Sequence, residues 1–253
     1  MSRAYYPLIQ GSQAWHDFRN SLPNIKASEA ASLIGLNPFK SAKQAITELS
    51  LALDGTPVEN KIDPFFQFHI DRGHALEPVA LLRVKCLFLK LHKCGVFVNG
   101  RDKVPFSASP DGLAECINGG KMLIEVKAPQ NRDQDVKPCY IVQLLVQMYC
   151  SGVAKGILVY VWSDGSVRIW DIDWDQDVWD EMLGWFRTAW DLAQQKNPKV
   201  DRSPNGEKRR REQLLLSLAV ENKQAVATIN QAELNRRKYV AGPKMVVHGF
   251  ECP

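Results

Sequence analysis

Apolar residues in this chain recur with two spacings, one typical of helices and one typical of strands. The helical spacing predicts helices at residues 13–19, 29–35, 41–54, 64–91, 138–151 and 174–196. Alternating positions and short apolar runs predict strands at residues 93–99, 104–107, 113–117, 121–128, 153–162 and 167–173. Residues 57–63 form a polar linker, and Pro78 should disturb its helix or begin a new one. Helical segments and strand hairpins therefore share the chain.

One predicted hairpin concentrates charged residues on a single face. Its two strands lie within residues 113–128 and are separated by an Asn-Gly-Gly sequence at 118–120, which can supply the positive φ angles of a tight turn. Folding about this turn brings Asp111 close to Glu125. Because side chains alternate along a strand, Glu125 and Lys127 share one face. We therefore expect two carboxylates and one ammonium in a small space.

This charged cluster has a chemical and a structural interpretation. Asp111 and Glu125 together fit a divalent metal ion, and Lys127 would then orient or deprotonate the water that attacks a phosphodiester. Alternatively, Glu125 and Lys127 form the solvated face of a half-buried strand. Asp111 stands between Pro110 and Gly112, which also suits an ordinary turn. The hairpin alone leaves both interpretations open.

A second candidate site lies near the N-terminus. Ser28 stands where the N-cap of the helix ending at Gly35 belongs, so its hydroxyl is expected to satisfy a backbone N–H. A helix N-terminus beside a hydroxyl and the guanidinium of Arg19 also suits a terminal phosphate. The residues are compatible with a cap, with an anion site, or with both.

Three more polar side chains could join the acidic hairpin. Glu77 is either a solvated carboxylate beside Pro78 or a third metal ligand that approaches from the helical layer. Gln143 and Gln147 fall on one stripe of the helix at 138–151, because they are one helical turn apart. Their amides either face water or bind a phosphate or the attacking water.

Length, charge and cysteine usage bound the class of protein. The 253 residues with 45% hydrophobic content suffice for a substantial core, and the net charge of +4 permits a polyanionic partner without demonstrating one. No apolar run reaches the roughly 18 residues of a membrane span, and the N-terminus lacks a signal-peptide core, so we expect a soluble, cytoplasmic protein. The six cysteines include no Cys-x-x-Cys pair, which predicts reduced and mostly buried thiols.

The composition changes after Pro198. Residues 207–239 are strongly charged, with basic clusters at 208–211 and 236–238. We expect one or two exposed helices, whose basic clusters contact nucleic acid, face solvent or form a subunit contact. This divides the chain into a domain of residues 1–198 and a charged helical extension of residues 199–253 without an assigned role.

Short motifs follow one another in a definite order over roughly residues 12–195. They are Trp15-x-x-x-Arg19, Ala27-Ser28, Arg72-Gly73 to Glu77, Ser109-Pro110-Asp111-Gly112, Glu125-Val126-Lys127, and Tyr140-x-x-Gln143 followed by Met148 and Gly152. This order resembles the phage lambda exonuclease family, the viral recombination nucleases of the PD-(D/E)xK superfamily. Leu145 departs from the pattern, since relatives can carry a second glutamine there, and nothing aligns after about residue 200.

The resemblance implies a fold and an activity. The fold would be a restriction-endonuclease-like α/β core, a central mixed sheet flanked by helices. The activity would be 5′-to-3′ digestion of one strand of linear duplex DNA, leaving a 3′ overhang for single-strand annealing. The resemblance also implies Mg²⁺ as cofactor, with a pair of ions per site and Mn²⁺ as a substitute. A ring-shaped homotrimer, a single-strand annealing protein as partner and a phage or prophage gene expressed in a bacterial cytosol are implied as well.

The resemblance also implies a role for each matching residue. The metal ligands would be Asp111, Glu125, the carbonyl of Val126 and, for a second metal, Glu77. Lys127 would activate water, and Gln143 would help to place that water or the scissile phosphate. The contacts to the terminal phosphate would be Arg19, Ser28 and Ser109.

Two other functions remain open at this point. A structure- or site-specific endonuclease of the same superfamily would carry the same acidic hairpin, but it has no need for the terminal-phosphate residues Arg19 and Ser28. A non-catalytic DNA-binding or assembly protein with this fold would not require Asp111, Glu125 and Lys127 together.

Overall fold

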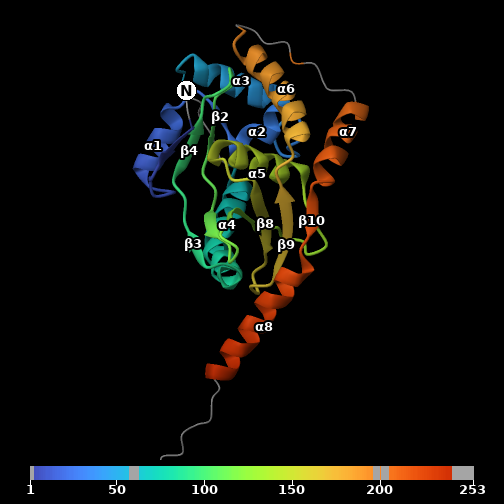
Figure 1. The fold of residues 1–253 in the computed structure, drawn as a ribbon. Coiled ribbons are helices and arrows are strands. Elements are labelled where there is room, and N and C mark those ends of the chain that lie inside the picture. Colours follow the sequence, from blue (N-terminus) through green and yellow to red (C-terminus); the bar gives the residue numbers. More distant parts are fainter. Residues whose placement is uncertain (1–2, 57–62, 196–199, 201–204, 241–253) are drawn as a thin grey trace, which may run out of the picture.

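A computed structural model describes residues 3–56, 63–195, 200 and 205–240 of the chain. These residues contain a larger and a smaller β-sheet (Figure 1). The larger sheet has the order β10-β9-β8-β7-β6-β3. Its strands are β3 (Lys90–His92), β6 (Gly112–Glu115), β7 (Lys121–Lys127), β8 (Lys155–Val161), β9 (Val167–Asp173) and β10 (Ala219–Glu221). The smaller sheet, in the order β1-β4-β5-β2, contains β1 (Arg3–Tyr6), β2 (Ile25–Lys26), β4 (Val96–Asn99) and β5 (Phe106–Ala108). Each sheet is mixed, because β7 pairs with β8 and β2 pairs with β5 in parallel.

Helices cover both faces of the larger sheet. On one face α5 (Pro138–Ser151) packs on the strands, and the core on that side is shared by α2 (Ala27–Leu33), α3 (Ala42–Leu53), α6 (Gln176–Ala193) and α7 (Asn205–Leu216). On the other lie α4 (Pro64–Val84), its short 3₁₀ continuation (Lys85–Leu87) and α8 (Lys223–Val240). Helix α1 (Gln13–Ser21) precedes β2, and the end of α8 projects beyond the sheet (Figure 1). The expected architecture, a mixed sheet flanked by helices, is confirmed.

Strand β7 separates the two hydrophobic cores. Leu123 packs in the core under α5, whereas Ile124 and Val126 pack in the core under α4. This follows from the alternation of side chains along a strand. Glu125 points with Leu123 toward α5 and is only 2% exposed. The solvated-face interpretation of Glu125 is therefore wrong, since this strand is covered on both sides.

The long helix predicted at 64–91 is shorter than expected. Residues 90–92 form β3 and pair with β6, so the chain there is extended. Helix α4 nevertheless continues through Pro78 without interruption. Proline removes one backbone donor, but Ala80, Leu81 and Val84 anchor the following turns in the core. Tertiary packing therefore overrides the local cost of Pro78.

Ser28 is not the N-cap that the sequence predicted. The cap position is Lys26, and α2 begins at Ala27, which places Ser28 inside its first turn. The cause is β2, because Ile25 and Lys26 are held extended by parallel pairing with β5. Its hydroxyl is thus available for another role.

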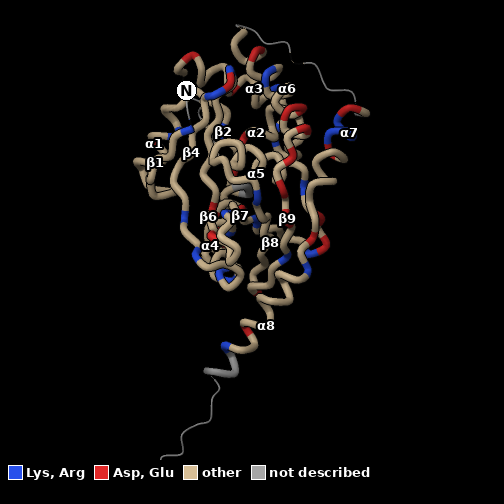
Figure 2. The backbone as a smooth tube through the Cα atoms, in the orientation of Figure 1, with Lys and Arg blue, Asp and Glu red and all other residues tan. Residues whose placement is uncertain are grey.

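The tail contains a strand that the sequence analysis did not predict. β10 pairs antiparallel with β9, and Ile229 of α8 is buried in the core beside α4. In α7 one glutamate stands on each side of the basic run at 208–211, and Figure 2 colours these charged positions. The pairs there are Arg211 with Glu207, Lys208 with Glu212 and Arg210 with Glu181. The basic cluster at 208–211 is therefore largely paired with carboxylates.

The described cysteines are free thiols, as expected. Cys86 is exposed and Cys116 is half-buried, whereas the others are buried. Cys252 and most of the linker predicted at 57–63 lie outside the described residues. No helix in the part of the chain that the structure describes is long and apolar enough to cross a membrane.

Candidate active site

The hairpin of β6 and β7 forms as predicted and places Asp111 beside the end of β7. Gly119 adopts a φ of +82° in the turn, and the register pairs Gly112 with Ile124. Asp111 precedes this pair directly, and its Oδ2 accepts a 2.7 Å hydrogen bond from the backbone N–H of Val126. The turn chemistry and the register together bring Asp111 and Glu125 to one end of the hairpin.

Glu125 lies at the centre of a network that joins β7 to α5. Its Oε1 accepts hydrogen bonds from Lys127 Nζ and from Gln143 Nε2, both at 2.6 Å. Lys127 Nζ also donates to Gln143 Oε1 at 2.9 Å. On the other side, Oε2 of Glu125 accepts from Gln147 Nε2 at 2.6 Å. The helical spacing of the two glutamines thus lets α5 hold both oxygens of one carboxylate.

Burial and charge make this site strongly electrostatic. Burial, followed by the charge of Glu125, raises the pKa of Asp111 well above its usual range; Glu77 adds to the increase, and Lys127 opposes it. For Lys127, burial lowers the pKa, but the charges of Glu125 and Asp111 outweigh burial and raise it. Lys127 is therefore held as an ammonium, and its single positive charge faces the buried carboxylates.

This donor set fits a divalent metal ion. Asp111 and Glu125 supply oxygen atoms, which Mg²⁺ prefers, and a bound cation would offset the burial and the repulsion by Glu125 that raise the pKa of Asp111. Glu77 Oε1 instead accepts from Lys93 Nζ at 2.9 Å. Among the described residues, no three His, Cys, Asp or Glu side chains converge as a ready set of ligands. The roles of Glu77 in a second metal position and of the Val126 carbonyl stay predictions.

The predicted phosphate contacts gather around Trp15. The guanidinium of Arg19 lies 4.3 Å from the centre of the Trp15 ring and donates to Ser28 Oγ at 3.3 Å. Trp15 Nε1 donates to Ser109 Oγ at 3.1 Å. Burial lowers the pKa of Arg19, while the charges of Glu29 and Glu125 oppose that effect. Arg19, Ser28 and Ser109 thus lie in one region, within electrostatic reach of the acidic hairpin.

Gln147 and Trp15 have positions that sequence reasoning did not identify. Gln147 was expected to face solvent or to bind a phosphate or the attacking water, but it is fully buried beneath Glu125, and its Oε1 has no hydrogen-bond partner among the residues that the structure describes. The sequence signal for this position was the spacing of Gln147 from Gln143, which places both amides on the same face of α5. The motif order includes Trp15 without a role, and in the structure its ring contacts the guanidinium of Arg19 and its Nε1 donates to Ser109.

Solved structures show a similar fold. The alkaline exonuclease LHK-Exo from Laribacter hongkongensis is 23% identical with a TM-score of 0.56, over 82% of this chain and 100% of that chain. LHK-Exo in complex with dAMP is 22% identical with a TM-score of 0.53, over 91% of this chain and 98% of that chain. At this identity the likeness establishes the fold. No curated protein sequence is significantly similar to the chain.

The family match confirms the resemblance that the motif order predicted. The family described as the YqaJ-like viral recombinase domain matches residues 14–154, which is more than half of the 253 residues. This range contains every residue assigned above to the acidic hairpin, the glutamine pair and the phosphate contacts. The chain belongs to the YqaJ-like viral recombinase domain family, and this membership supports a nuclease role in recombination.

Proposed function

We propose that this protein is a Mg²⁺-dependent exonuclease that digests one strand of linear duplex DNA from 5′ to 3′. The product would be a 3′ single-stranded overhang suited to recombination by single-strand annealing. The observation that carries the proposal is the buried network of Asp111, Glu125, Lys127 and Gln143. The cluster of Arg19, Ser28 and Ser109 supports the direction, because it offers donors for a 5′-terminal phosphate.

Each side chain in the network has a distinct task. Mg²⁺ held by Asp111 and Glu125 would supply charge stabilisation for the developing phosphorane. The ammonium of Lys127 would orient the attacking water and neutralise charge on the phosphate, and its hydrogen bonds to Glu125 and Gln143 support this role. The amide of Gln143 bonds to both Glu125 and Lys127 and thereby fixes their separation. The backbone N–H of Val126 fixes the orientation of Asp111.

A digestion assay on linear and covalently closed duplex DNA tests the function. With Mg²⁺ we expect loss of the linear substrate and survival of the closed circle, and with a chelator we expect neither to be cut. Labels at the 5′ and 3′ ends report the direction, because a 5′ label should be released first. Cleavage of the closed circle would indicate an endonuclease. Binding of DNA without cleavage in Mg²⁺ or Mn²⁺ would indicate a non-catalytic DNA-binding protein.

Replacing Gln147 with Leu should slow digestion roughly tenfold without preventing folding, the size expected when a residue supporting a metal ligand is lost. The physical reason is that Gln147 holds Oε2 of Glu125, and leucine has a similar volume but no donor. The measurement is the initial rate together with Mn²⁺ affinity by titration calorimetry. Gln147→Glu serves as a second variant, since it places a carboxylate against Glu125. Wild-type rate and Mn²⁺ affinity in both variants would show that Gln147 only fills space.

The assembly implied by the resemblance is also part of the proposal. We expect a closed homotrimer that encircles its product strand and digests processively, with a single-strand annealing protein as partner. Sedimentation velocity should give three times the 28.6 kDa chain mass. A monomer that digests processively would contradict the ring. Removing α8, by ending the chain after Asn222, tests its contribution to assembly; because Ile229 of α8 is buried in the core beside α4, a thermal unfolding curve must first show that the shortened chain folds.

A further inference from the structure

Gln10, in the segment between β1 and α1, contacts the acidic hairpin. Its Nε2 donates to Oδ1 of Asp111 at 3.5 Å, a long hydrogen bond. The other oxygen of this carboxylate, Oδ2, accepts from the backbone N–H of Val126. Two segments that are distant in sequence, the one before α1 and the end of β7, therefore hold the two oxygens of Asp111.

The second polar atom of the Gln10 side chain is unused. Its Oε1 is buried and has no hydrogen-bond partner within the part of the chain that the structure describes. Because the nitrogen and the oxygen of an amide are bonded to the same carbon, Oε1 also lies close to Asp111. Buried polar atoms in proteins are nearly always hydrogen-bonded. This oxygen is therefore an acceptor that a group bound beside Asp111 can use.

A tight turn presents Gln10 to the hairpin. The backbone N–H of Ser12 donates to the carbonyl of Ile9 at 3.0 Å, and Gly11 has a φ of +82°. Among the described residues, positive φ angles occur only at glycines, so Gln10 has a negative φ. This combination fits a type II turn with Gln10 in its second position and glycine in its third. The Gln-Gly pair is the sequence signal for this turn.

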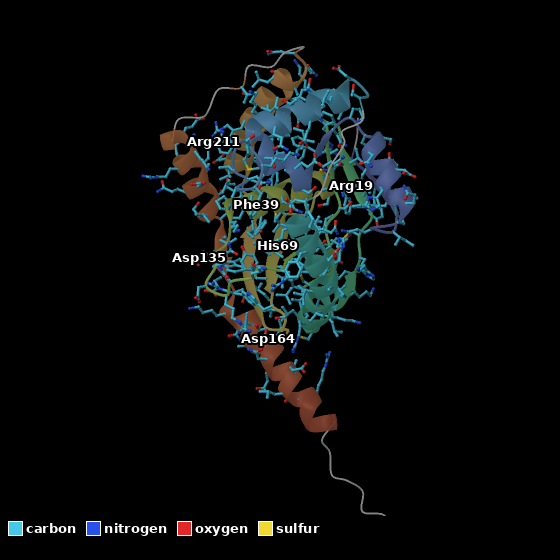
Figure 3. The ribbon with its side chains drawn as sticks, turned by 180° about the vertical axis from the view of Figure 1, so that it is seen from behind. Arg19, Phe39, His69, Asp135, Asp164 and Arg211 are labelled. Carbon is cyan, nitrogen blue, oxygen red and sulfur yellow. The ribbon has the colours of Figure 1, made fainter. Side chains whose placement is uncertain are left out.

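The chain is anchored on both sides of the turn. Before it, β1 pairs with β4, and the chain passes so near Gly95 that an added Cβ would lie 2.0 Å from the carbonyl oxygen of Tyr6. After it, Ser12 caps α1 by accepting from the backbone N–H of Trp15. The same helix carries Arg19, which is marked in Figure 3. These contacts fix the turn independently of the acidic hairpin.

We propose that Gln10 is a positioning residue of the metal site, which orients Asp111 through Nε2 and accepts a hydrogen bond from a water of the bound cation through Oε1. The inference rests on the proposed nuclease function. Mg²⁺ in proteins usually keeps several of its waters, and those waters need acceptors. The carbonyl oxygen of an amide is an acceptor only, so it suits this task.

Mn²⁺ titration calorimetry on the full chain without DNA tests the role of Gln10. Gln10→Leu should bind Mn²⁺ about tenfold more weakly, because leucine has a similar volume but neither donor nor acceptor. Gln10→Glu should bind Mn²⁺ at least as tightly as wild type, since it keeps an acceptor and adds negative charge. Without metal, Gln10→Glu should unfold at a lower temperature than wild type, because its carboxylate then faces Asp111.

Gln13→Leu is the matched control. Gln13 lies on an exposed part of α1, and its Nε2 donates to Oδ1 of Asp17 at 2.8 Å. This substitution removes the same kind of hydrogen bond outside the metal site, so Mn²⁺ affinity should be unchanged. If Gln10 only filled space, Gln10→Leu would keep the wild-type affinity, and Gln10→Glu would lose affinity together with stability. Either result would overturn the inference, and the second still decides it if Gln10→Leu does not fold.

The calorimetry also separates this inference from the proposed function. A wild-type protein that binds Mn²⁺ but digests no DNA would refute the nuclease, and the affinities of the variants would still decide the role of Gln10. Equal Mn²⁺ affinity of wild type and Gln10→Leu would overturn the inference at any rate of digestion. A wild-type protein that binds no Mn²⁺ would refute both.

Discussion

Glu125→Gln is expected to lower the rate of DNA digestion by roughly a thousandfold or more, while the chain still folds. The substitution keeps the shape of the side chain but removes the charge that pairs with Lys127 and that would hold Mg²⁺. Asp111→Asn and Lys127→Ala should be similarly severe, because each removes one member of the same network. The measurements are the release of acid-soluble nucleotides, Mn²⁺ affinity and thermal unfolding.

A control on the same hairpin separates this effect from a general change in charge. Glu115 lies on β6, is partly exposed and pairs with Lys90 at 3.4 Å, so Glu115→Gln should digest DNA at the wild-type rate. DNA binding in a chelator should persist in all variants. If Lys127→Ala kept near wild-type cleavage, the orienting role assigned to its ammonium would be wrong, even if the Glu125→Gln and Asp111→Asn variants were inactive.

The acidic hairpin could be predicted because its determinants are local. An Asn-Gly-Gly turn fixes the pairing of β6 with β7, and the alternation along β7 fixes which side chains accompany Glu125. The degree of burial could not be predicted from the hairpin alone. Burial of Glu125 depends on helices that are distant in sequence, because α5 covers one face of β7 and α4 covers the other.

The errors occur where pairing between distant segments decides a local structure. Ser28 has a suitable cap sequence, but pairing of β2 with β5 moves the start of α2. Similarly, β10 is a short Ala-Val-Glu segment between two helices, too short to show a period, and it becomes a strand because β9 offers an unpaired edge. The contact of Gln147 with Glu125 could not be predicted either, because helical spacing shows which side chains share a face of α5 but not what that face contacts.

Digestion of a duplex with a 5′-phosphate is expected to be much faster than digestion of one with a 5′-hydroxyl. Arg19→Ala should remove most of this preference, slowing the phosphorylated substrate by roughly ten- to a hundredfold, the size expected for hydrogen bonds to a charged group. The reason is that Trp15 supports the guanidinium of Arg19 on one side and the hydroxyl of Ser109 on the other. Initial rates for both enzymes on both substrates measure the effect, and Mn²⁺ affinity should be unchanged.

Ser28→Ala distinguishes a phosphate contact from a helix cap. A true N-cap would cost about 1 kcal/mol of stability when replaced by alanine, but Ser28 lies inside the first turn of α2, and its hydroxyl accepts from Arg19. We therefore expect little change in unfolding temperature and a clear loss of the 5′-phosphate preference. Arg101→Ala, at an exposed arginine between β4 and β5, is the control and should keep the full preference. If Arg19→Ala slowed both substrates equally, Arg19 would contact the duplex without regard to its 5′ end, and the 5′-phosphate would have to be bound by other residues.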